Sequence, residues 1–342
     1  MSGDESPAEE SSAPDSAAGA APAEKSPAAD SATGDASAEK STADQSRTEE
    51  SAADVFGLLS DPIRVDVLRA MARDRTYADM GGVDGLTFSD IYDRVDVDNT
   101  SKLSYHLGEL TGTFVRKDDG EYTFTHAGEH IVRFILARNF VEPRDVGVHP
   151  VDGTCLHCET EALEARINHQ FFLVECRDCG MPNLGHGITP AQARDRDWPA
   201  LVESLTHRQA SEFARIGRGH CPMCDGPLSR SIRRVTADAV PEVISLAAID
   251  TCEECLRCYS APPSYTVAQH PASVAFHWDH GVDITAIPMW EFHTRLVDGR
   301  WTSERVGTDP EEYRVVMRAD GDELRAYLDG RARVTRTERV RR

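Results

Sequence analysis

The spacing of apolar residues predicts helices in the first folded part of the chain. Residues 62–72 place their apolar side chains on one face, and the preceding Asp61-Pro62 pair suits a helix N-terminus. Residues 100–110 repeat this pattern, with three leucines at the spacing of one helix face. Shorter helices are expected over residues 53–59 and 88–95.

Beyond residue 113 the pattern changes from helical to alternating. Apolar and polar residues alternate over residues 114–117 and again over 121–125. The intervening residues 118–120, Asp-Asp-Gly, are typical of a β-hairpin turn. A further helix is expected over residues 127–140, and Pro143 closes the region. Four helices, a hairpin and a last helix in this order follow the plan of a winged helix-turn-helix.

The rest of the chain mixes strands with helices. Residues 165–175 have the apolar content of a strand pair, and residues 190–216 are typical of a helical connector interrupted at Trp198-Pro199. The histidine-rich residues 270–281 are expected to form a packed helix. The end of the chain predicts a β-meander with Asp-Gly turns, and its candidate strands are residues 290–293, 313–317 and 323–328.

Composition separates the first fifty residues from everything that follows. Residues 1–50 contain no aromatic residue and no Leu, Ile or Val, so they cannot bury enough apolar surface to offset the entropy of ordering. We predict a disordered acidic tail there. It has no apolar core of a secretory signal, and the chain has no apolar run that would span a membrane. We therefore expect a cytoplasmic protein.

The charge balance is strongly acidic. The chain has 58 acidic and 37 basic residues, a formal net charge of −21, and only four of the basic residues are lysines. This balance is typical of proteins from salt-accumulating halophiles, where molar salt screens the self-repulsion of the acidic surface. An ordinary acidic protein with an acidic tail is the alternative.

Nine cysteines fall between residues 155 and 258, all of them within C-x-x-C segments. In a protein without an export signal, such pairs indicate metal ligands rather than disulfides. The first two pairs are separated by the spacing of a four-cysteine zinc ribbon. They are Cys155 with Cys158, and Cys176 with Cys179.

A second zinc site is expected to begin at Cys221 and Cys224. Its other two ligands come from Cys252, Cys255 and Cys258, and the spacing leaves open which two of these complete it. With four thiolates and no open position, both zinc sites are expected to be structural.

These observations predict an α+β fold. It comprises an N-terminal winged helix-turn-helix, two zinc-ribbon-like units with helices, and a C-terminal β-meander. The expected parts are a tail (1–50), a DNA-binding domain (51–142), zinc-ribbon unit 1 (143–189), a helical connector (190–217), and zinc-ribbon unit 2 with a C-terminal α/β extension (218–342).

Two segments of the first domain resemble the ArsR-like family of winged helix-turn-helix regulators, of the type found in halophilic archaea with a C-terminal zinc-ribbon region. Residues 58–64, LLSDPIR, are similar to the family's L-x-D-P-x-R helix opening. Residues 101–110, SKLSYHLGEL, are similar to its S-x-L-S-x-H-L-x-x-L recognition helix. The resemblance implies double-stranded DNA as a partner and a homodimer formed through the terminal helices.

A recognition helix buries one side and offers the other to the major groove. The expected DNA-contacting residues lie on the open side of the recognition helix and in the hairpin. They are Thr100, Ser101, Lys102, Ser104, Tyr105, His106, Arg116 and Lys117. The domain is not basic overall, because residues 53–140 hold 15 acidic and 10 basic residues. Binding would therefore depend on hydrogen bonds, shape and local positive charge.

We therefore expect a DNA-binding transcriptional regulator with two structural zinc ions and no catalytic residues. The effector, the operator, and the choice between repression and activation stay open. One alternative is a protein-interaction scaffold of the transcription apparatus that does not bind specific DNA sequences. Another is a zinc-dependent enzyme, which would need a zinc with histidine or carboxylate ligands and a vacant position.

Overall fold

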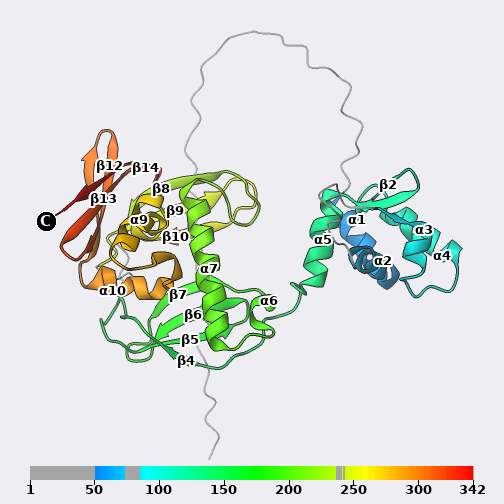
Figure 1. The fold of residues 1–342 in the computed structure, drawn as a ribbon, viewed down its shortest axis with the longest axis horizontal. Coiled ribbons are helices and arrows are strands. Elements are labelled where there is room, and N and C mark those ends of the chain that lie inside the picture. The colour runs from blue at the N-terminus through cyan, green and yellow to red at the C-terminus, as the bar shows by residue number, and fades with distance from the viewer. Residues whose placement is uncertain (1–50, 74–84, 236–240, 242, 342) are drawn as a thin grey trace, which may run out of the picture. The chain divides into compact units, whose positions relative to one another are not determined.

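The computed structural model describes residues 51–73, 85–235, 241 and 243–341. These residues form helices and several antiparallel sheets, which confirms the predicted α+β class (Figure 1). Residues 1–50, predicted to be a disordered tail, lie outside the described residues. Among the described residues, none of the helices has the length and apolar character needed to cross a bilayer.

Helices dominate residues 51–136. Asp61 immediately precedes α2, and its carboxylate accepts a hydrogen bond of 2.8 Å from the backbone N–H of Ile63. Asn99 caps α4 in the same way, since its side chain accepts from the N–H of Lys102. Both caps stabilise N–H groups that lack partners inside the helix. The helices before the hairpin are α1 (Ala52–Gly57), the 3-10 helix η1 (Leu58–Ser60), α2 (Pro62–Ala72), α3 (Phe88–Tyr92) and α4 (Thr100–Leu110).

The predicted hairpin is present. Strand β2 (Val115–Asp118) pairs antiparallel with β3 (Glu121–Phe124), and the short β1 (Leu86–Thr87) pairs with the other edge of β3. The two turn residues, Asp119 and Gly120, both have positive φ, 46° and 88°, as a type I′ turn requires. Helix α5 (His126–Leu136) follows and ends earlier than predicted.

Helix α2 is central to this part of the chain because it contacts both α4 and α5. Leu103, Leu107 and Leu110 of α4 are fully buried, as predicted. They join the apolar side chains of α2 and of the hairpin in one core. The leucine side of α4 is thereby fixed against the body of the domain.

Residues 149–217 form a four-stranded antiparallel sheet covered by helices. Its strands, in spatial order, are β4 (His149–Val151), β5 (Leu163–Asn168), β6 (Phe171–Cys176) and β7 (Pro182–Gly187). The strand pair predicted over residues 165–175 corresponds to β5 and β6. Helix α6 (Pro190–Ala193) is followed by the long α7 (Trp198–Gly217), which Trp198-Pro199 begins rather than interrupts.

Residues 228–286 add a second, three-stranded antiparallel sheet and two helices. The strands are β8 (Leu228–Arg234), β9 (Leu246–Cys252) and β10 (Cys258–Ala261), with β9 in the centre. Helix α8 (Pro263–Ala268) leads into α9 (Pro271–Asp279), which confirms the helix expected in the histidine-rich segment. His270 caps this helix, and the 3-10 helix η2 (Ile284–Ala286) follows it.

The predicted β-meander is present, but one of its expected strands is not. Residues 290–293 are helical, because Met289, Phe292 and Leu296 are buried at helical spacing in η3 (Met289–Glu291) and α10 (Phe292–Val297). The meander consists of β11 (Trp301–Thr308), β12 (Glu311–Ala319), β13 (Asp322–Asp329) and β14 (Val334–Val340) in sequential order.

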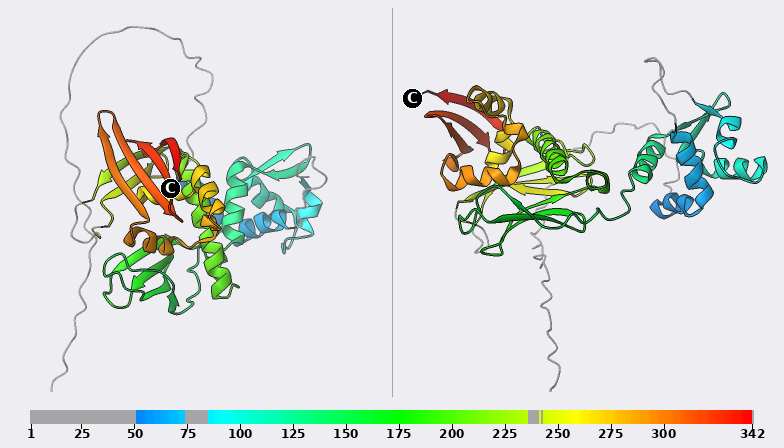
Figure 2. Two further views of the ribbon diagram at one scale, coloured as in Figure 1. Left: turned by 60° about the vertical axis from the view of Figure 1, so that its left-hand side comes forward. Right: turned by 60° about the horizontal axis from the view of Figure 1, so that its bottom comes forward.

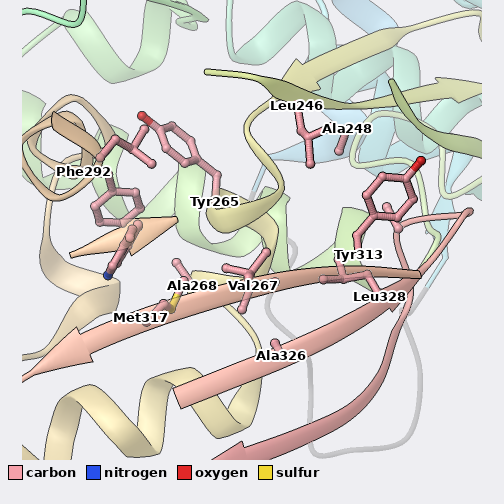
Figure 3. Close-up of a cluster of buried hydrophobic side chains, with 14 of the residues drawn as sticks. Leu246, Ala248, Tyr265, Val267, Ala268, Phe292, Tyr313, Met317, Ala326 and Leu328 are labelled. Carbon is pink, nitrogen blue, oxygen red and sulfur yellow. The ribbon is translucent and has the colours of Figure 1, made fainter. Parts of the chain in front are cut away.

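Two apolar cores hold residues 149–341 together. Figure 3 shows the larger one, where Tyr265 of α8, Phe292 of α10 and Met317 of β12 converge. The meander packs against α8 and α10. Figure 2 shows its orange and red strands lying side by side. The second core lies between the β4–β7 sheet and the N-terminal half of α7, through Leu201 and Leu205. Phe213, further along α7, packs on the larger core, so this one helix spans both.

Candidate metal centres and nucleic-acid interface

The first four cysteines of the sequence meet at one point. The ligand atoms of Cys155, Cys158, Cys176 and Cys179 all lie within 4.8 Å of one another. Cys155 Sγ is 3.7 Å from Cys179 Sγ, and Cys158 Sγ is 3.6 Å from Cys176 Sγ. The predicted grouping of these cysteines is therefore present.

A second group resolves the choice among the last three cysteines. Cys221, Cys224, Cys252 and Cys255 also have their Sγ atoms within 4.8 Å of one another. Cys258 lies outside this group, at the start of β10, where its Sγ accepts a hydrogen bond from the Thr251 hydroxyl. The prediction of Cys258 as a possible ligand is thus not supported by the geometry.

All four C-x-x-C segments adopt one turn. The first cysteine of each segment donates its N–H to the carbonyl five residues later; Cys155, for example, donates to Thr160 at 2.9 Å. The residue after the second cysteine has positive φ each time, and a backbone N–H can then turn toward a thiolate. These four residues are Glu159 (60°), Gly180 (70°), Asp225 (63°) and Leu256 (60°).

Backbone N–H donors lower the pKa of the thiols in the first cysteine group, whereas burial raises it. Burial raises the pKa of Cys176, but N–H groups of Cys179 and Asp178 and the Thr160 hydroxyl lower it to about 6. The Met181 N–H lowers the pKa of Cys179, yet burial and the neighbouring thiols raise it to about 12. Four thiolates therefore do not coexist at this spacing without a cation to balance their charge.

The geometry fits a tetrahedral metal ion. Two Sγ–Sγ distances in each group are 3.4 to 3.7 Å, and all lie within 4.8 Å. The ligand separation expected around a tetrahedral ion with bonds of about 2.3 Å is about 3.8 Å. Each group pairs two buried with two exposed cysteines. Both groups could therefore hold a metal ion with all four positions occupied by sulfur.

The side of α4 opposite its buried leucines is accessible to solvent. Thr100, Ser101, Ser104 and Tyr105 are exposed, and 61% of Tyr105 is accessible. Lys102 is partly exposed, and its ammonium group lies 3.1 Å from Asp98, four residues earlier in the chain. The predicted candidates at these five positions therefore lie along one accessible face, with a single acidic neighbour held against the cation.

His106 does not belong to this face, contrary to the prediction. Only 5% of the residue is exposed, and its Nδ1 lies 3.8 Å from the carboxylate of Asp61 at the N-terminus of α2. It follows Leu103 by three residues and precedes Leu110 by four, so helical spacing turns it toward the core. We assign His106 to the packing of α4 on α2.

A short turn, residues 111–114, joins α4 to the hairpin. The Phe114 N–H donates to the carbonyl of Leu110, and the Gly112 N–H donates to that of Val115. Arg116 and Lys117 are exposed on β2, and the Lys117 ammonium lies 5.1 Å from the centre of the Tyr122 ring. Acidic residues Asp118 and Asp119 occupy the tip beside them. The positive charge predicted for the hairpin is thus present on the strand but not at its tip.

Two family models match the chain. The domain of unknown function DUF7347 matches residues 52–135, which include α4 and the hairpin. The domain of unknown function DUF7351 matches residues 152–334, which include both cysteine groups. The second match covers more than half of the chain, so the protein belongs to the DUF7351 family. No curated protein and no solved structure matches the chain.

Proposed function

We propose that this protein is a DNA-binding transcriptional regulator whose N-terminal domain is a winged helix-turn-helix. The observation that carries the proposal is α4, a capped helix with one side buried and the other side open. The order α2, α3, α4, hairpin, α5 is that of winged helix-turn-helix domains. The ArsR-like sequence segments fall on the start of α2 and on α4, which supports the same class.

The open face of α4 is suited to hydrogen bonding more than to charge attraction. Four of its residues carry hydroxyl groups that donate to phosphates or base edges. They are Thr100, Ser101, Ser104 and Tyr105. In molar salt, counterion release contributes little to affinity, so hydrogen bonds and shape would carry the binding.

Two charge pairs on this domain allow a matched test of DNA binding. Lys102 pairs with Asp98 on the open face, while Arg69 pairs with Asp66 on α2 at 3.4 Å. Tyr105→Ala and Lys102→Gln are expected to weaken binding to the protein's own promoter about tenfold each, the loss of one good contact. Asp98→Asn is expected to strengthen it, because the change frees the ammonium and removes a charge that repels phosphate. Fluorescence anisotropy in molar potassium chloride measures these affinities.

The second pair supplies the control. Arg69→Gln and Asp66→Asn change charge by the same amounts and are expected to leave the affinity unchanged. If no promoter duplex binds better than a random one, the regulator proposal is wrong. In that case a protein-interaction scaffold is the better explanation. The acidic hairpin tip at Asp118 and Asp119 favours this alternative, because its carboxylates repel phosphate.

We further propose a homodimer formed through α5. Phe134 and Phe140 near the end of this helix are 43% and 58% exposed, and their rings lie 6.3 Å apart. Phe134→Glu is expected to convert a dimer to a monomer in light scattering at high salt. Trp278→Glu, which changes an exposed aromatic residue of α9, serves as the control and should leave the mass unchanged. A wild-type protein with the mass of a monomer contradicts the dimer.

We propose that both cysteine groups hold zinc in a structural role. Zinc prefers thiolate ligands in tetrahedral geometry, and a site closed by four sulfurs stabilises folding without activating water. Cys155, Cys158, Cys176 and Cys179 would hold the first ion, and Cys221, Cys224, Cys252 and Cys255 the second. The closed sulfur set supports a protein without zinc-dependent catalysis.

A further inference from the structure

A cavity of about 400 Å³ is lined by residues that include neighbours of both cysteine groups, Leu156 and Met223. Strand β7, helix α7 and the β9–β10 segment contribute to its walls. Most of the wall is apolar, with Phe171, Leu184, Phe213 and Met289 among its residues. This volume falls in the range of pockets that bind small molecules.

Two buried residues of the cavity wall have polar atoms without a hydrogen-bond partner in the described part of the chain. Gln209 of α7 is fully buried, and neither its amide nitrogen nor its amide oxygen has a hydrogen-bond partner among the described residues. His293 is 1% exposed, and its Nδ1 likewise has no partner in that part of the chain. Burial lowers the pKa of His293 to about 3, so the ring is neutral. Buried polar groups are normally paired, and these two border a cavity that can supply a partner.

One residue of the cavity wall, Arg257, is an exposed cation. Arg257 is exposed, and its Nη2 lies close to Gly187 of β7, 3.8 Å from where a Cβ atom would stand. Within the described residues no carboxylate lies at ion-pair distance from Arg257. The other charged wall residues satisfy one another, since Glu212 accepts from Arg208 at 2.7 Å and pairs with His186 at 2.9 Å.

We infer that this cavity binds a small organic carboxylate with an aromatic or aliphatic body. The carboxylate pairs with Arg257, the body contacts the apolar wall, and a second polar group meets Gln209 and His293. A guanidinium favours carboxylate over a neutral group of the same shape because its hydrogen bonds to charged acceptors are stronger.

Isothermal titration of the full chain tests the charge requirement directly. The probes are 3-phenylpropanoate, its neutral amide 3-phenylpropanamide, and acetate, which lacks the apolar body. One phenylpropanoate is expected to bind per chain, about tenfold more tightly than the amide or acetate. Arg257→Gln removes the preference for the acid over the amide. Arg218→Gln changes an exposed arginine that does not line the cavity and retains the preference.

Two outcomes overturn the proposal: the absence of phenylpropanoate binding, or a preference that Arg257→Gln does not change. The assay contains no DNA, so its result is independent of the regulator proposal.

A stability measurement tests whether the buried amide of Gln209 lacks hydrogen-bond partners in the ligand-free protein. Gln209→Leu removes two unpartnered polar atoms, so it is expected to raise the thermal midpoint of the ligand-free protein by about 2–4 °C. Gln192→Leu is the control with the opposite sign, because Gln192 is well bonded: its Oε1 accepts from Thr189 and Arg208. A Gln209→Leu variant that is less stable than wild type shows that the amide is already satisfied, and the assignment of this residue to ligand binding then fails.

Discussion

Replacing Cys252 with serine is expected to remove one of two zinc ions per chain, whereas replacing Cys258 removes none. Cys252 lies in the second cysteine group, with its Sγ 3.4 Å from that of Cys224. Cys258 is six residues further on and outside the group. A structural zinc contributes about 10–16 kcal/mol of binding free energy in small domains, so its loss should unfold the surrounding structure.

Elemental analysis of purified variants measures the zinc content, and circular dichroism follows unfolding on heating. The Cys252→Ser protein should also lose the cooperative transition of the β8–β10 region, while Cys258→Ser melts like wild type. Strong chelators should reproduce the effect of Cys252→Ser in the wild-type protein. Equal zinc loss in both variants contradicts the ligand assignment, and wild-type protein without tightly bound metal contradicts the zinc proposal.

The C-x-x-C pattern predicted which cysteines of the first group, and which of the first pair of the second group, come together. A C-x-x-C pair brings two sulfurs to one side of a turn, whatever surrounds it, so local spacing is sufficient. Local spacing could not decide among Cys252, Cys255 and Cys258, because both C-x-x-C pairs in this segment have the same spacing. Leu256 adopts φ of 60°, which closes the turn after Cys255, and Cys258 then pairs with Thr251 across two strands. That pairing depends on the β9–β10 register, which spacing does not specify.

The burial of His106 could not be predicted from the sequence for a different reason. Helical spacing places His106 on the leucine side of α4, although a histidine has no apolar character to mark it as buried. Its Nδ1 lies 3.8 Å from the carboxylate of Asp61, which is 45 positions earlier in the chain. The leucines were predictable because apolar character and spacing agree. A polar residue on the buried side is predicted only when its tertiary partner is known.

The cavity gave no signal in the sequence. Its walls come from segments between Leu156 and His293, and no short stretch contains enough of them to form a pattern. Gln209 and Arg257 are ordinary helix and turn residues when each is read alone. Their significance depends on burial and on missing partners, and only the folded arrangement of α7 and β10 supplies these.

Gly128→Ala is expected to destabilise the N-terminal domain by about 3 kcal/mol or more, the upper range for overpacking. Gly128 is buried in the first turn of α5, and a Cβ atom there would stand 1.8 Å from the carbonyl oxygen of Phe114. This oxygen cannot easily move, because it accepts a hydrogen bond of 3.1 Å from the N–H of Thr125, the cap of α5. The added methyl must therefore separate α5 from the segment that leads into β2.

A second helical glycine makes the control. Gly108 of α4 is exposed, and nothing lies within 4 Å of the Cβ atom that alanine would add. Gly108→Ala is expected to stabilise the same domain by about 0.5–1 kcal/mol, because alanine loses less backbone entropy than glycine in a helix. Chemical denaturation of the two variants, followed by circular dichroism, measures both changes. Similar effects of the two substitutions would contradict the close approach of α5 to Phe114, and with it the packing that fixes the hairpin beside α4.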